Sequence, residues 1–129
     1  MLRPILSALA ITTLISLAPP VHAGVKTNLP VSVDPVARNG KGAIGSTRNS
    51  ADAVQFIYCY ATHAVNAAAF CAARDVAGTV VSCFTTDPNK VAIVSAMTDY
   101  SYIFFSYDAA GTCTQLLVEN ASFYPPMIP

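Results

Sequence analysis

The side chains of this 129-residue chain with the clearest capacity for chemistry are four cysteines: Cys59, Cys71, Cys83 and Cys113. Their number is even, which in an oxidising compartment predicts two disulfides. The competing use is a structural zinc site, which normally takes cysteines in close pairs with two to four residues between partners. Successive cysteines here lie 12, 12 and 30 positions apart. The spacing therefore predicts disulfides, with no metal site and no other cofactor.

His63 is the candidate for acid–base chemistry, because the other histidine, His22, lies in a segment that we expect to be removed. A Ser-His-Asp or Cys-His site would have to use it. Aspartates are abundant, but three of them are better explained as turn or cap residues, and no pair is spaced for glycoside hydrolysis. No catalytic residue is assigned, and a small secreted hydrolase that uses His63 and an aspartate is kept as the alternative hypothesis.

Two short motifs match the sequence without a supporting context. Gly40-Lys-Gly-Ala-Ile-Gly45 fits G-x-G-x-x-G, which indicates dinucleotide binding only between a buried strand and a helix. Here a Pro- and Asn-rich segment precedes it, so we expect a chance match. Asn120-Ala-Ser122 is a glycosylation triplet that matters only in a eukaryotic secretory pathway.

Residues 1–23 are typical of a secretory signal peptide. Arg3 supplies the positive charge, Ile5 to Leu17 form an uncharged apolar run, and Val21-His-Ala23 places small side chains before the expected cleavage point. The run of about 13 residues is too short to span a bilayer, so we expect no membrane span after the leader is cleaved. A retained membrane anchor is the alternative. The expected location is secreted or periplasmic.

Charge and composition exclude two classes of partner for the chain after Ala23. Six basic residues face seven acidic ones, with no block of either sign, so the basic surface that nucleic-acid binding needs is absent. A basic amphipathic helix for membrane surfaces is absent as well.

The remaining chain is expected to form an extended arm over 24–50, followed by one globular domain over 51–129 with a Pro-rich tail. Val31 and Val33 alternate and could add an edge strand. Strands are predicted at 54–61, 70–75, 79–85, 100–107 and 112–119, and a helix at 88–97 that begins after Asp87. The fold class predicted is α+β: a small antiparallel sheet of about five strands with one helix (β-β-β-α-β-β), stapled by disulfides. An all-β sandwich without the helix is the alternative.

One turn occurs twice, as Asp75-Val-Ala-Gly-Thr79 and Asp108-Ala-Ala-Gly-Thr112. Asp at the first position and Gly at the fourth favour a type I turn with a G1 bulge. The first turn then sets Cys71 opposite Cys83. The second sets Cys113 opposite Tyr107, Phe104 opposite Leu116 and Tyr102 opposite Val118.

This register suggests Cys71–Cys83 and Cys59–Cys113 as the leading pairing of three possible ones. Counting from the turn makes 71/83 a hydrogen-bonded pair, in which the Cα atoms lie farther apart. A disulfide from Cys59 to Cys71 or to Cys83 is therefore also possible. The register also places Tyr102, Phe104, Leu116 and Val118 on a core face. The opposite face is then a possible interface, either for an unknown protein partner or for self-association, unless Leu29, Val31 and Val33 of the arm cover it. Its residues are Ile103, Phe105, Tyr107 and Leu117.

Several segments resemble a group of small exported bacterial proteins with four cysteines. The match covers about residues 45–125 and includes Arg48-Asn-Ser-Ala-Asp52, Cys71-Ala-Ala-Arg-Asp75 with Gly78, Thr86-Asp87 and Gly111-Thr-Cys113, with Ala37-Arg-Asn before it. The resemblance implies export and a four-cysteine framework, and it transfers no catalytic residue. Together these observations favour an exported, non-catalytic protein with a binding or structural role.

Overall fold

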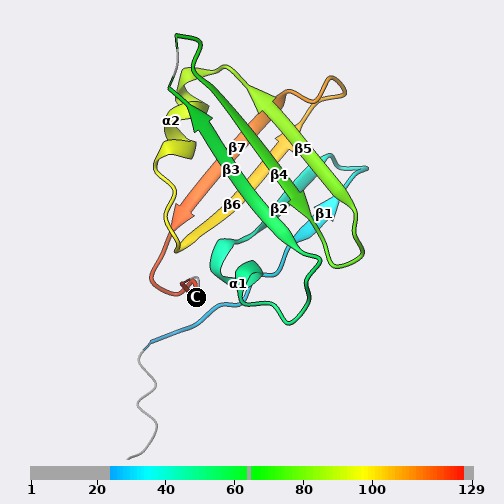
Figure 1. Cartoon of the computed structure of the whole chain (residues 1–129), viewed down its shortest axis with the longest axis vertical. Helices are drawn as coiled ribbons and strands as arrows, with labels where there is room; N and C mark the ends of the chain where they lie inside the picture. Colours follow the sequence, from blue (N-terminus) through cyan, green and yellow to red (C-terminus); the bar gives the residue numbers. More distant parts are fainter. Residues whose placement is uncertain (1–23, 64, 127–129) are drawn as a thin grey trace, which may run out of the picture.

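Two antiparallel sheets and two short helices make up the part of the chain that the computed structural model describes, residues 24–63 and 65–126 (Figure 1). The expected leader over 1–23 lies outside these residues. In chain order the elements are β1 (Ser32–Asp34), β2 (Asn39–Ala43), α1 (Ile44–Arg48), β3 (Phe56–Thr62), β4 (Ala68–Arg74), β5 (Val80–Thr85), α2 (Pro88–Ser95), β6 (Ser101–Tyr107) and β7 (Cys113–Asn120).

The predicted order β-β-β-α-β-β is present from β3 to β7, but the single five-stranded sheet is wrong. The strands form one sheet in the order β1-β2-β6-β7 and a second in the order β3-β4-β5. The two sheets face each other, with α2 at one end (Figure 1). The fold is thus mostly β, and it keeps the helix that the all-β alternative would lack.

The segment expected to be an arm contributes β1, β2 and α1 to the domain. Val31 is buried, and the predicted edge strand is present as β1. β2 was missed because its sequence, Asn-Gly-Lys-Gly-Ala, has poor strand propensity. Its glycines are required by close packing: a Cβ at Gly40 would lie 2.9 Å from Cζ of Phe105, and one at Gly42 would lie 3.2 Å from Cα of Val31.

Both D-x-A-G-T turns form as predicted. The N–H of Asp75 donates to Thr79 O at 3.1 Å, and the N–H of Thr79 donates to Oδ1 of Asp75 at 2.9 Å. Gly78 and Gly111 have φ of 86° and 80°, the left-handed conformation that this turn needs. The register of the first hairpin is confirmed, with Cys71 opposite Cys83.

The register of the second hairpin is correct only beside the turn. Tyr107 faces Cys113, but a bulge between Ser106 and Tyr107 shifts the rest by one residue, so Phe104 faces Leu117 and Tyr102 faces Glu119. A shift of one residue changes which side chains of β6 share a face with Leu116. The predicted core face of Tyr102 and Phe104 is therefore wrong.

Two of the residues predicted for an interface instead form the centre of the core. Ile103 and Phe105 are fully buried, and Tyr107 packs at the core margin. Leu117 is exposed on the other face of the same sheet. The side chains that enclose Ile103 and Phe105 come from both sheets and from α2: Ile57, Cys59, Ala69, Cys71, Ala73, Val81, Cys83, Val91, Val94, Cys113 and Leu116.

The disulfides are Cys59–Cys71 and Cys83–Cys113, so the leading predicted pairing is wrong. The hydrogen-bond alternation explains why. Because 75/79 is a hydrogen-bonded pair, 71/83 is one too, and Cys71 directs its N–H and C=O toward β5. Its pair with Cys59 on the other side is then the narrow, non-hydrogen-bonded kind, with Cα atoms 4.1 Å apart. The second bond joins the two sheets.

The predicted helix is present as α2, which ends at Ser95, two residues earlier than expected. Asp87 caps it as predicted, since its side chain accepts from the N–H of Asn89 at 2.9 Å and Pro88 occupies the first turn. Val91 and Val94 face the core. No helix among the described residues is long and apolar enough to cross a membrane.

Candidate functional site: the outer aromatic face of the three-stranded sheet

Aromatic side chains gather on the outer face of the sheet β3-β4-β5. Strands alternate between faces, so the inward residues of β3 fill the core and the others point outward. The ladder places the outward residues in three cross-strand rows. We call them the aromatic face: Tyr60, Phe70 and Phe84 in the first row, Tyr58, Ala72 and Ser82 in the second, and Phe56, Arg74 and Val80 in the third.

The rings contact one another across and along the strands. Ring centroids of Tyr60 and Phe70 lie 5.6 Å apart, those of Tyr58 and Phe70 lie 6.2 Å apart, and Tyr58 and Tyr60 stack at 6.4 Å. These separations are typical of attractive aromatic pairs. The guanidinium of Arg74 lies 5.0 Å from the ring centroid of Phe56. The rings therefore form one ordered layer on the surface.

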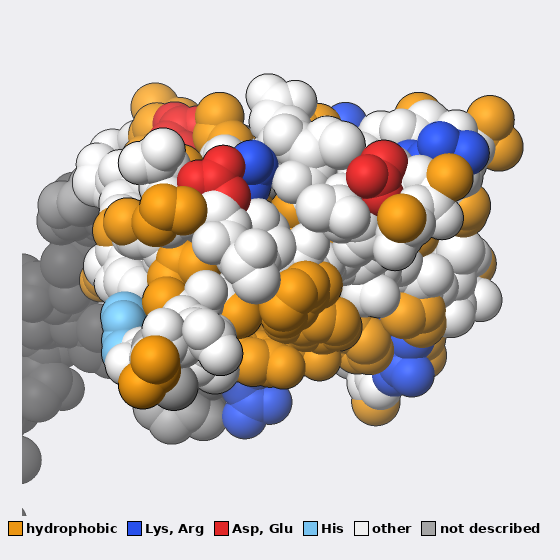
Figure 2. Space-filling view, turned by 90° about the horizontal axis from the view of Figure 1, so that it is seen from above, with side chains coloured by type: hydrophobic (Ala, Val, Ile, Leu, Met, Phe, Trp, Pro, Cys, Tyr) orange, Lys and Arg blue, Asp and Glu red, His pale blue; other side chains and the backbone are white. Residues whose placement is uncertain are grey.

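This layer is open to solvent. Tyr60 is 53% exposed, Phe84 50% and Tyr58 43%. Figure 2 shows hydrophobic side chains gathered along the lower part of the view, the side on which the three-stranded sheet lies. A contiguous exposed apolar patch is uncommon on a monomer and marks an interaction site. The outer face of the other sheet differs, because the buried Tyr124 stacks on Tyr102 with ring centroids 5.9 Å apart and covers part of it.

Charge is nearly absent from the aromatic face. Arg74 is its charged residue, and the Nε–H of Arg74 donates to the main-chain oxygen of Val54 at 2.5 Å. Tyrosine, phenylalanine and arginine are enriched in the centres of protein interfaces, where other charged residues are depleted. The composition of this face thus suits contact with another macromolecule better than binding of a small charged ligand.

The sequence contained a signal for this face. Phe56, Tyr58 and Tyr60 alternate with Ile57 and Cys59, so both sides of β3 are apolar. The cysteine side must face inward once Cys59 is bonded to the buried Cys71. The aromatic side then faces outward. Whether another element covers it depends on the tertiary structure and cannot be predicted from the sequence.

A polar loop over 48–55 lies beside the N-terminal end of β3. Oδ1 of Asp52 accepts from the N–H groups of Val54 and Gln55 at 2.9 and 2.8 Å, and its Oδ2 accepts from Nε2 of Gln55 at 2.5 Å. These bonds from Gln55 and Val54 hold the pKa of the Asp52 carboxyl well below its usual range. Gln55 in turn accepts from the N–H of Val31 at 2.9 Å, which ties the loop to the first segment of the domain.

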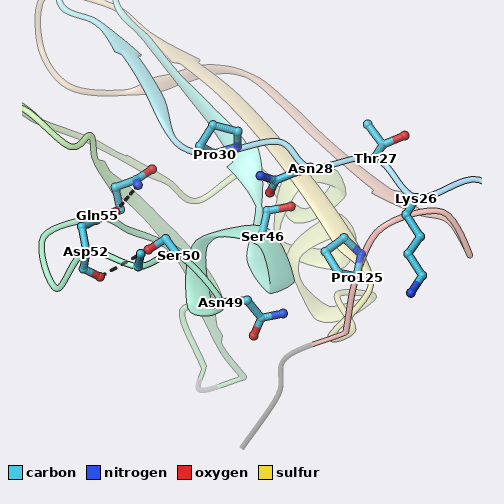
Figure 3. A pocket seen from close by; sticks show the side chains of 11 residues that line it. Lys26, Thr27, Asn28, Pro30, Ser46, Asn49, Ser50, Asp52, Gln55 and Pro125 are labelled. Carbon is cyan, nitrogen blue, oxygen red and sulfur yellow. Dashed lines mark hydrogen bonds between the residues drawn. The ribbon is translucent and has the colours of Figure 1, made fainter.

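A cavity of about 560 Å³ lies between this loop, α1 and the two terminal segments (Figure 3). Several of its polar lining groups already have partners within the chain. Ser46 accepts from the N–H of Leu29 at 3.0 Å, and Nδ2 of Asn49 donates to Pro126 O at 2.9 Å. Gln55 and Asp52 are bonded to each other as described above. These bonds give this side of the cavity wall a structural role.

His63 lies near one serine but not in a catalytic arrangement. Its Nε2 is 3.5 Å from Oγ of Ser95, and that hydroxyl donates to the main-chain oxygen of Val91 at 3.0 Å. His63 is exposed and has no carboxylate partner among the described residues. No group of three or more potential metal ligands occurs within the described part of the chain.

Comparisons of this chain with protein-family models, with curated proteins and with solved structures find no match.

Proposed function

We propose that this protein is an exported, non-catalytic binding protein, and that its aromatic face contacts a protein partner. The observation that carries the proposal is the exposure of Tyr58, Tyr60 and Phe84 on a sheet whose other face is fully used by the core. Single exposed apolar residues are ordinary on protein surfaces, whereas a contiguous group of exposed rings indicates a role beyond packing. Such a group lowers solubility and is typical of a surface that binds a partner.

Export is supported by the two disulfides and by the signal-peptide pattern of residues 1–23. A hydrolase built on His63 has less support, because the described residues bring the imidazole no carboxylate and the nearby Ser95 hydroxyl is directed to a helix carbonyl. A disulfide-stapled sheet with a rigid aromatic surface suits recognition, since little ordering is needed on binding.

Site-specific photo-crosslinking in the producing cells tests the proposal. A photoreactive phenylalanine analogue replaces Phe84 on the aromatic face, and in a control chain it replaces Val36, which is 94% exposed on another surface. We expect a discrete adduct with a second protein from position 84 and none from position 36. Absence of any adduct from position 84, or equal adducts from both positions, would contradict the proposal.

A further inference from the structure

Arg74 is the charged residue of the aromatic face, and its guanidinium is held in place by two contacts. The Nε–H donates to the main-chain oxygen of Val54 at 2.5 Å, and the guanidinium lies 5.0 Å from the ring centroid of Phe56. Both contacts exist within the chain itself, so the group is positioned before any partner binds. A side chain that is already ordered loses little conformational freedom on binding.

The other two nitrogens of this guanidinium, Nη1 and Nη2, are free to bind a partner. Neither has a hydrogen bond or an ion pair with another described residue. Both reach solvent, because the described part of the chain contains no buried side-chain nitrogen or oxygen that lacks a partner. Arginine nitrogens only donate, so the group that satisfies them must be an acceptor.

The positive charge of Arg74 is also left without a compensating carboxylate among the described residues. The aspartates of the adjoining segments are engaged elsewhere. Asp75 accepts from the N–H of Thr79, and Asp52 accepts from Gln55 and from the main chain of its own loop. An otherwise uncharged apolar face thus carries one uncompensated cation, and the complementary surface of a partner carries one negative charge.

We propose that the protein partner of the aromatic face presents the carboxylate of an aspartate or glutamate to Nη1 and Nη2 of Arg74, with an apolar surface beside it. Two neighbouring guanidinium nitrogens match the two oxygens of a carboxylate, which accepts two parallel N–H bonds. A phosphate group would bring a charge of about −1.5 to −2, and the aromatic face has a single cation to meet it. A carboxylate is the anion that one guanidinium neutralises.

The place of Arg74 in the sheet sets where the acidic side chain of the partner must lie. Arg74 is in the third row of the aromatic face, and the first row lies four residues farther along the strands. At the usual rise per residue this is about 13 Å. The carboxylate therefore lies at one end of the contact, and the apolar part of the partner covers the exposed rings of Tyr58 and Tyr60.

The chemistry of the partner is tested from Val80, which lies opposite Arg74 in the third row and is 55% exposed. The photoreactive phenylalanine analogue replaces Val80 in the otherwise unchanged chain, and the crosslinked peptide is sequenced by mass spectrometry. Side chains directly opposite in a ladder are about 5 Å apart, so we expect an aspartate or glutamate within about two residues of the attachment point. A peptide without one, or no adduct from position 80 beside an adduct from position 84, would overturn the inference.

Substitution of Arg74 tests its contribution to binding. In the chain with the analogue at position 84, Arg74→Gln should lower the adduct yield at least about tenfold, because loss of one partner of a hydrogen-bonded charge pair strongly weakens an interface. Lys41→Gln is the matched control, since it removes the same charge from an exposed position of β2 in the other sheet. It should leave the yield unchanged. Equal yields from the two variants would overturn the inference.

A double substitution separates the proposed pair from the bond between Arg74 and Val54, which Arg74→Gln also removes. Changing the acidic residue found in the partner to its amide should lower the yield as Arg74→Gln does, and both changes together should lower it no further. A further loss in the double variant would overturn the pair. The partner's amide variant alone provides the test if Arg74→Gln does not fold, and an unchanged yield from it would overturn the pair as well.

The inference rests on the proposed function, but the two can fail separately. Absence of any adduct from position 84 would end both. An adduct from position 84 whose yield does not depend on Arg74 in a folded Arg74→Gln chain would end the carboxylate contact and leave the proposed function standing.

Discussion

The polar residues of the R-N-S-A-D and A-R-D segments are used for main-chain hydrogen bonds. Asp52 accepts from two successive N–H groups, and Arg74 donates to the carbonyl of Val54 in the same loop. Asp75 closes its turn through the N–H of Thr79. These contacts join the loop before β3 to the end of β4. The polar side chains therefore stabilise the sheet that carries the aromatic face and do not form a site of their own.

Asp52 should make the protein sensitive to acid. Its folded pKa is lowered by hydrogen bonds from Gln55 and Val54, so the stability that it contributes is present above the unfolded pKa of about 3.9 and is lost as the pH falls below it. Asp52→Asn keeps an oxygen for the main-chain bonds but loses the charge. We expect a lower free energy of unfolding at pH 7 and a smaller loss between pH 5 and 3, measured by urea unfolding with tyrosine fluorescence. An unchanged pH dependence would show that Asp52 is not the group responsible.

Gly45 is required by its contact with the C-terminal segment. A Cβ there would lie 1.7 Å from the carbonyl oxygen of Pro125, so one of the two backbones must move. We expect Gly45→Ala to lower the free energy of unfolding by about 1–3 kcal/mol, in the range of other overpacking substitutions, and to increase protease cleavage after Phe123. As a control, Ala53→Gly changes an exposed position of the neighbouring loop that does not contact Pro125, and its free energy of unfolding should change less. Equal stability of Gly45→Ala and the wild type would contradict the contact.

At the scale of elements, turns were predictable from sequence and sheet membership was not. Asp75 and Gly78 encode a turn that sets its own register, because the side chain, the φ and the bulge are all local. The predicted register of the second hairpin is wrong beyond Tyr107, because no residue type marks the bulge beside Ser106. The sequence does not predict β2, because glycine at position 40 has low strand propensity. The need for glycine there comes from Phe105, which is 65 positions away in the chain.

The disulfide pairing was within reach of the same local argument. Alternation from the Asp75 turn makes 71/83 the wide, hydrogen-bonded pair, and this disfavours the predicted Cys71–Cys83 bond. What the sequence could not supply was the strand on the other side of β4, since β3 is joined to it by a connection without a turn motif. Once Cys59 is paired with Cys71, Cys83 and Cys113 are the two that remain, and their bond requires the two sheets to face each other.

The two disulfides should differ in their contribution to stability. In the chain-entropy model a bond that closes 30 residues stabilises by about 3.5 kcal/mol and one that closes 12 by about 3 kcal/mol. We expect Cys83→Ala/Cys113→Ala to lose more stability than Cys59→Ala/Cys71→Ala, also because it disconnects the two sheets. Urea unfolding compares them. The opposite order, or peptide mapping that joins Cys71 to Cys83, would contradict this arrangement of the core.

At the scale of the whole molecule, export predicts a defined N-terminus. If the leader is cleaved after Ala23, the first residue of the secreted protein is Gly24. N-terminal sequencing of protein recovered from outside the cytoplasm should read Gly-Val-Lys-Thr. Protein that keeps residues 1–23 and stays with the membrane would instead support the alternative of a retained anchor.

The molecule as a whole has one face closed by its own chain and one left open. Tyr124 covers part of the outer side of the four-stranded sheet, while the outer side of β3-β4-β5 has no such cover among the described residues. The disulfide between Cys83 and Cys113 fixes the open sheet to the rest of the core. The fold thereby holds an aromatic surface rigid and exposed, which is the arrangement expected of a binding protein.

The most direct test of this account is the yield of the position-84 adduct when the opposite side of the aromatic face is removed. Tyr58→Ser/Tyr60→Ser takes away two exposed rings that the fold does not bury. If the face binds as a unit, the adduct with the second protein should fall at least about tenfold, since aromatic anchors at interfaces each contribute more than that factor. An unchanged adduct yield in this variant, with its fold intact by circular dichroism, would contradict the central claim.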